Sequence, residues 1–163
     1  MATTTVNLKP LEEWAKKLIA QQKDVAIENA ANYAQQKVVR AFETSEYQRR
    51  TGNLDDSFLW IVCYDGEIKK HGFLFDSQQA TQPIERNGKT YNGRVEAEKF
   101  IATYQSKVTN GIEIVFASAM FYAGFLEEGT QRNDVYKVLR GIEDDLLNDG
   151  FDEVKTNIFP IQI

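Results

Sequence analysis

The chain contains one cysteine and one histidine among its 163 residues. With Cys63 alone no internal disulfide can form, and its place in the apolar run of residues 58–64 predicts a buried thiol that packs as a small hydrophobe. His71 cannot build a histidine and cysteine metal cluster by itself, and its predicted strand favours a polar strand residue over a catalytic base. Phosphate-binding glycine loops of the forms G-x-G-x-x-G and G-x-x-x-x-G-K-[ST] are absent. We therefore expect no cofactor, no metal and no enzymatic activity.

Long hydrophobic runs are also absent. No apolar stretch approaches the ~20 residues that cross a bilayer, and residues 1–5 lack the pattern of a signal peptide. The net charge of −5 gives no general attraction for nucleic acid. Apolar and charged fractions of 42% and 26% are typical of a folded globular chain. We therefore expect a single cytosolic domain over residues 1–163, with neither a membrane nor a specific nucleic-acid sequence as its partner.

A long helix is the strongest secondary-structure signal. Between residues 11 and 42 the apolar residues recur at three- and four-residue steps, which is typical of one apolar helical face. Pro10 suits the first turn, and Glu12 and Glu13 complement the helix dipole. An unbroken helix would be about 48 Å long, whereas a globule of this length is about 40 Å across. Either the helix breaks around residues 21–24, or it projects and needs a partner.

The middle of the chain predicts strands. Residues 57–64 and 67–75 are rich in β-branched and aromatic residues, and the Asp65-Gly66 turn between them indicates a hairpin. Residues 76–93 are polar and predict a long loop or an excursion hairpin. Residues 95–107 suit either a short helix or an alternating strand, and we expect a strand. Residues 112–117 predict a strand that pairs with the preceding one or with residues 57–64.

The C-terminal part returns to helical spacing. We expect a short helix at 119–128 that ends at Gly129 with positive φ, a second helix at 134–148, and a closing strand at 153–163. The predicted fold class is therefore α+β, with a long N-terminal helix and a second C-terminal helix packed on an antiparallel β-sheet.

Charged residues offer a few candidate sites. The carboxylate pairs Asp55-Asp56, Glu127-Glu128 and Asp144-Asp145 suit the acid and base of a hydrolase, but we expect them to be solvated, with the first pair at the start of a helical turn. Arg49-Arg50, with Lys37 and Arg40, forms a basic concentration. It suits either a phosphate or acidic partner, or pairing with Asp55, Asp56 or the helix C-terminus.

Two segments of turn and cap residues lie on either side of the predicted strands. Residues 50–57 read RTGNLDDS, and residues 121–130 read FYAGFLEEGT. Their order resembles that of the tail-completion, or head-to-tail joining, proteins of long-tailed bacteriophages. In that family a TG-x-L-x-x-S segment precedes a strand and a YA-x-x-x-E-x-GT segment follows one. The matching positions are Thr51, Gly52, Leu54 and Ser57 in the first segment, and Tyr122, Ala123, Glu127, Gly129 and Thr130 in the second.

This resemblance implies a structural protein of a phage or prophage virion. Such a protein assembles in the cytoplasm of the bacterial host and forms a ring in the neck or tail of the virion, as an adaptor between the portal, or connector, and the tail tube. Its partners would be its own copies, portal and tail-tube proteins. Two alternatives remain: a small cytosolic carboxylate-dependent hydrolase, and a protein-binding module unrelated to virions.

Overall fold

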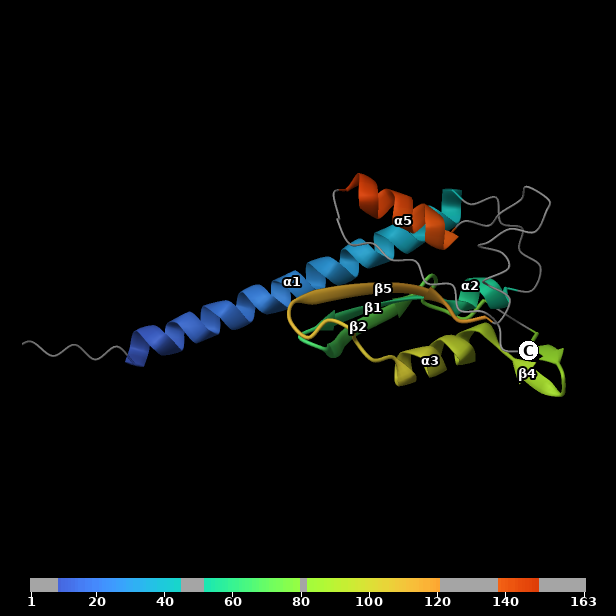
Figure 1. The fold of residues 1–163 in the computed structure, drawn as a ribbon, viewed down its shortest axis with the longest axis horizontal. Helices are drawn as coiled ribbons and strands as arrows, with labels where there is room; N and C mark the ends of the chain where they lie inside the picture. Colours follow the sequence, from blue (N-terminus) through green and yellow to red (C-terminus); the bar gives the residue numbers. More distant parts are fainter. Residues whose placement is uncertain (1–8, 45–51, 80–81, 121–137, 150–163) are drawn as a thin grey trace, which may run out of the picture.

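The computed structural model describes residues 9–44, 52–79, 82–120 and 138–149. Its elements are α1 (Lys9–Thr44), α2 (Asn53–Ser57), β1 (Phe58–Tyr64), β2 (Glu67–Phe73), β3 (Ile84–Arg86), β4 (Lys89–Tyr91), α3 (Gly93–Thr103), β5 (Ile112–Ser118) and α5 (Val138–Asn148). Figure 1 shows α1 across one side of the sheet, α3 on the other side, and α5 against α1. The α+β class and the N- and C-terminal helices are confirmed.

The main sheet has three antiparallel strands in the order β2-β1-β5. Asp65 and Gly66 have φ values of 50° and 85°, the left-handed pair that a tight hairpin turn needs, so the predicted β1–β2 hairpin is confirmed. Of the two pairings considered for β5, the one with β1 forms, with Phe58 opposite Ser118. Of the two alternatives for residues 76–93, a long loop or an excursion hairpin, a hairpin forms within this range: β3 and β4 pair around Asn87 and Gly88.

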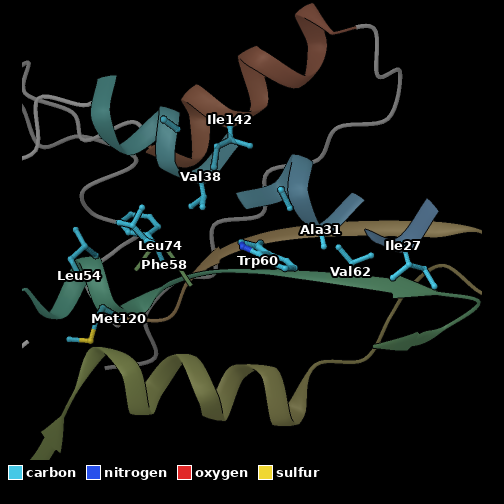
Figure 2. Close-up of a cluster of buried hydrophobic side chains, with 12 residues drawn as sticks. Ile27, Ala31, Val38, Leu54, Phe58, Trp60, Val62, Leu74, Met120 and Ile142 are labelled. Carbon is cyan, nitrogen blue, oxygen red and sulfur yellow. The ribbon is translucent and has the colours of Figure 1, made fainter. Parts of the chain in front are cut away.

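The central strand β1 is buried on both faces. Its side chains alternate between a cluster beneath α1 and a second cluster that includes residues of α3. Phe58, Trp60 and Val62 belong to the first cluster, and Leu59, Ile61 and Cys63 to the second. Figure 2 shows residues of α1 meeting this strand, while Ile142 of α5 approaches Val38. The burial predicted for Cys63 is confirmed, since its residue is 1% exposed.

The prediction of a strand at residues 95–107 is wrong, because most of this region belongs to the helix α3. Asn92 caps the helix, since its Oδ1 accepts a hydrogen bond from the Val95 amide at 3.2 Å. Ala97 is fully buried in the second cluster, with Phe100 and Ile101 packed against that cluster. This helical spacing gives α3 one apolar face for the sheet, which an alternating strand would split between two sides.

The helix α1 runs without a break for 36 residues, so of the two alternatives that the sequence left open, the interruption at 21–24 does not occur. Its N-terminal half extends beyond the sheet in Figure 1. The contacts with the β1–β2 hairpin include Lys23, whose Nζ lies 3.7 Å from Asp65 Oδ2 and 3.8 Å from the centre of the Tyr64 ring. Because α1 is unbroken and extends past the sheet, the second alternative, a projecting helix, is the one that forms.

The expectation of one apolar face along α1 is wrong. The core-facing residues of its C-terminal half are Ile27, Ala31, Ala34, Val38 and Ala41, each at most 7% exposed. The large apolar residues of its N-terminal half face away from the core and form what we call the outward stripe: Leu11, Trp14, Leu18, Ile19 and Val25, which are 40–67% exposed. At about 100° per residue the two sets lie about 170° apart around the helix. The apolar side of α1 thus changes from one face to the opposite face between Val25 and Ile27.

Part of the predicted C-terminal arrangement is present. The helix expected at 134–148 is confirmed where the structure describes it, as α5. Ala119 and Met120 are not helical, and the rest of the helix expected at 119–128 lies outside the described residues. So do the Gly129 cap and the closing strand at 153–163.

Candidate functional site

The first sequence motif forms a short buried helix. Gly52 has φ 71°, a left-handed conformation that glycine adopts readily, and it directly precedes α2. The Asp56 amide donates a hydrogen bond to the Gly52 carbonyl at 3.0 Å, which closes the first turn. All five residues of α2 are buried, and Leu54 is 1% exposed. We call residues 52–57 and the backbone that they hold the α2 joint.

Asn53 connects the α2 joint to two distant segments. Its Nδ2 donates a hydrogen bond to the Gln82 carbonyl at 2.7 Å, and its Oδ1 accepts one from the Gly93 amide at 3.0 Å. Gly93 packs directly on the Asn53 backbone, where a Cβ would lie 1.9 Å from the carbonyl oxygen. The side chain of Asn53 therefore fixes both the approach to the β3–β4 hairpin and the start of α3.

Asp56 and Ser57 connect the joint to the segment that follows β2 and to the end of β5. Asp56 Oδ1 accepts a hydrogen bond from the Gln79 amide at 2.7 Å. Ser57 Oγ donates to the Leu54 carbonyl at 2.7 Å and lies 2.9 Å from Ser118 Oγ at the end of β5. These buried polar groups have lost their contacts with water, and the hydrogen bonds within the protein replace them. The motif thereby links α2 to the segment at Gln79 and to the end of β5.

The expectation that Asp55 and Asp56 are solvated is wrong, because they are only 0% and 1% exposed. The sequence correctly predicted a helical turn beginning there, but a turn that is covered on all sides buries its acidic residues as well. The Gln79 amide that Asp56 accepts from lies more than twenty positions along the chain. Asp144 is exposed and Asp145 half-buried, whereas Glu127 and Glu128 lie outside the described residues.

A second polar cluster holds α5 on α1. Lys37 Nζ lies 2.7 Å from Asp149 Oδ2 and 3.4 Å from Asp145 Oδ2, while Arg40 Nε lies 3.5 Å from Asp145 Oδ2. Tyr33 donates its hydroxyl hydrogen to Asp149 Oδ2 at 2.6 Å. The hydrogen bond with Asp149 raises the pKa of Lys37, and the one from Lys37 lowers the pKa of Asp149.

These contacts show that two of the four basic residues, Lys37 and Arg40, form ion pairs within the chain. Lys37 and Arg40 pair with Asp145 of α5, which is not among the partners expected from the sequence. Arg49 and Arg50 lie outside the described residues, so the pairing considered for them stays a prediction.

A third polar cluster surrounds Glu113 of β5. Tyr104 and Ser106 donate hydrogen bonds to its two carboxylate oxygens at 3.1 and 2.6 Å. Burial, followed by the nearby Glu113 carboxylate, raises the pKa values of both Tyr104 and Cys63. Because a nucleophilic cysteine needs a lowered pKa, this environment is typical of an inert thiol.

An open groove of about 570 Å³ lies between α1 and the β2 edge of the sheet. Its lining residues are Glu28, Ala31, Asn32, Gln35, Trp60, Lys69, Lys70, His71 and Asp76. Trp60 Nε1 donates to Gln35 Oε1 at 2.6 Å, and Lys70 pairs with Glu28. His71 is an exposed residue of β2, as the sequence predicted. Four of the polar side chains that line the groove are therefore paired with one another.

The structure places three of the nine motif residues. Gly52, Leu54 and Ser57 come together in the α2 joint. Thr51 and the second motif, Tyr122, Ala123, Glu127, Gly129 and Thr130, lie outside the described residues. Sequence reasoning missed Asn53 and Gly93, because their contact joins positions forty residues apart.

No protein-family model, curated protein or solved structure matches the chain. Within the described residues no group of histidine, cysteine, aspartate and glutamate could hold a metal ion. In the same part of the chain, no helix has both the length and the apolar character needed to span a membrane. The likeness to the tail-completion family therefore stays an expectation that depends on the two sequence motifs.

Proposed function

We propose that this chain is a virion structural protein of a phage or prophage, which forms a ring-shaped adaptor between the portal and the tail tube. The observation that carries the proposal is the outward stripe of α1. Five apolar residues, 40–67% exposed, lie on the half of α1 that extends beyond the sheet (Figure 1). An exposed apolar surface of this kind marks an interaction site for protein.

The motif geometry supports the same conclusion. A TG-x-L-x-x-S segment that served catalysis would expose its polar groups to a substrate. Here Ser57 is fully buried and bonds to Leu54 and Ser118, and Gly52 supplies a turn. The segment that carries the family resemblance thus has a structural role, as an adaptor whose function is geometric requires.

The proposed partners are neighbouring copies of the chain, portal or connector proteins and tail-tube proteins. Assembly takes place in the cytoplasm of the bacterial host, and the protein then belongs to the neck or tail of the virion. The β3–β4 hairpin suits contact with other virion proteins, because its Glu85, Thr90 and Lys89 are exposed and it lies apart from the main sheet.

The hydrolase alternative has less support. Its most direct candidates, Asp55 and Asp56, are buried within the α2 joint, where a substrate would have to displace α2 and the segment at Gln79. The other alternative, a protein-binding module unrelated to virions, uses the same outward stripe, so only an experiment separates it from the adaptor.

The test is deletion of the gene in the phage or lysogen that encodes it. We expect filled heads and complete tails that fail to join, and tailed particles restored when the chain is supplied in trans. Electron microscopy of the lysate counts both populations. Normal numbers of infectious tailed particles without the gene would contradict the proposal, as would a hydrolytic activity of the purified chain that is lost in Glu127→Gln.

A further inference from the structure

The side of α1 that faces away from the core changes character along the helix. In the C-terminal half this side carries polar, exposed residues, namely Asn29, Asn32, Gln36, Arg40 and Glu43. In the N-terminal half the same side carries the outward stripe. Its opposite side there carries Lys9, Glu13, Lys16 and Lys23, so the core-facing line does not continue as an apolar surface. A helix that merely overran its own sheet would keep its apolar residues on the core-facing line.

The outward stripe is also wider than the seam of a two-helix pair. At about 100° per residue, Trp14 and Ile19 lie at its two edges, about 140° apart. A two-stranded coiled coil needs only the narrow line of its a and d positions. A wider apolar arc lets one helix contact two neighbours at the same time, one along each edge.

The charges beside the two edges are complementary in their order along the helix. Glu12 and Lys23 lie beyond the Ile19 edge, and Lys17 and Asp24 lie beyond the Trp14 edge at similar heights. When copies lie side by side and parallel, the Glu12 edge of one helix faces the Lys17 edge of the next. Charge pairs that flank an apolar seam in this way set partner and orientation.

We infer that the occupant of the outward stripe is the same stripe of neighbouring copies, so that N-terminal halves of α1 pack in parallel around the axis of the ring. The inference rests on the proposed ring and specifies which surface closes it. Each contact is heterologous, with the Ile19 edge of one copy against the Trp14 edge of the next, and such contacts close into a ring when the rotation allows.

The first test is the oligomeric state of the full chain. Native mass spectrometry and sedimentation, from low micromolar to millimolar protein, should show species larger than a dimer. Leu18→Glu should weaken their formation at least about a hundredfold, because a carboxylate would be buried without a partner. Gln36→Glu is the matched control on the same side of α1, and it should have no effect. Circular dichroism of both variants should match the parent, since both positions are exposed.

The second test uses a short bismaleimide cross-linker and cysteines at the two edges. The double variant Trp14→Cys with Ile19→Cys should give a ladder beyond covalent dimers, whereas Ile19→Cys alone should give none, because a parallel neighbour presents its opposite edge. Covalent dimers alone, in either variant, would establish a two-fold pair and overturn the inference. A monomer at every concentration would overturn it too.

The two proposals fail in different ways. If larger species persist unchanged in Leu18→Glu, the ring stands and another surface closes it. If heads and tails join without the gene, the adaptor function itself is wrong, whatever the helices do in solution.

Discussion

Gly93 packs against Asn53 so closely that no side chain fits between them: a Cβ on Gly93 would lie 1.9 Å from the Asn53 carbonyl oxygen. The same pair shares a hydrogen bond of 3.0 Å from the Gly93 amide to Asn53 Oδ1. The start of α3 and the start of α2 are thereby fixed at one point, between residues forty positions apart.

Replacing Gly93 by alanine should therefore destabilise the fold. The new methyl group would push the backbone of α2 away from α3, and overpacking of this kind typically costs about 1–3 kcal/mol or more. Urea unfolding followed by circular dichroism measures the change. Gly141→Ala in α5 is the control: nothing lies within 4 Å of a Cβ there, so it should stabilise by about 0.5–1 kcal/mol through helix propensity. Equal stability of Gly93→Ala and the parent would show that the contact is wrong.

The change of face in α1 can be tested with two isoleucines on the same helix. Ile27 is 7% exposed and Ile19 is 67% exposed. Ile27→Ala should cost about 2–5 kcal/mol by loss of burial and creation of a cavity, whereas Ile19→Ala should stay within about 0.5 kcal/mol. The measurement is denaturant unfolding at low protein concentration, where copies are apart. Similar costs at both positions would restore the single apolar face that the sequence predicted.

The α1–α5 cluster predicts a dependence of stability on pH. Hydrogen bonds from Lys37 and Tyr33 lower the pKa of Asp149 in the folded chain, so its contribution is present above the unfolded carboxyl pKa of about 3.9 and is lost as the pH falls further. The pKa of Lys37 is raised, so its contribution is lost only in alkali, above the ordinary lysine value.

Asp149→Asn should therefore reduce stability at neutral pH and flatten the loss between pH 5 and pH 2. Urea midpoints across this range measure both effects, and Asp144→Asn, at an exposed position of α5, is the control. If Asp149→Asn loses stability between pH 5 and pH 2 as steeply as the parent, the ion pair between Asp149 and Lys37 does not form in solution.

Cys63 should resist thiol reagents in the native protein. Its thiol is buried, and both burial and the Glu113 carboxylate raise its pKa, so little thiolate forms at neutral pH. Titration with a chromogenic disulfide should proceed slowly in buffer and go to completion in guanidinium. Asn32→Cys adds an exposed thiol on α1 and should react at once. Rapid reaction of the parent would indicate that the sheet opens readily.

Local patterns predicted much of this fold. The two hairpins follow from Asp65-Gly66 and Asn87-Gly88, because turn chemistry acts over neighbouring residues. The error at α3 arose where Phe100, Ile101 and Tyr104 suit both a helix and a strand, and packing against β1 decides between them. In α1 the three- and four-residue steps persist on both sides of Val25, so periodicity alone did not reveal the change of face.

The α2 joint was predicted least completely. Gly52 and the helical turn after it were evident from residues 50–57. The residues that bond to Asn53 and Asp56, however, lie within residues 76–93, for which the sequence predicted only a loop or a hairpin. Burial of aspartate and asparagine depends on backbone groups brought in by the tertiary fold, and such pairing leaves no periodic trace in the sequence. The outward stripe, in contrast, was visible as apolar spacing, although its solvent exposure was not.

The unbroken course of α1 makes it a lever arm. From Lys23, which contacts the β1–β2 hairpin, to Leu11 the helix rises about 18 Å at 1.5 Å per residue. A rotation of the domain by about 10° would therefore displace Leu11 by about 3 Å. A partner that binds the N-terminal end of α1 therefore also sets the orientation of the rest of the domain. Small changes in packing at Leu11 and Trp14 would then alter the diameter and the cone angle of an assembly.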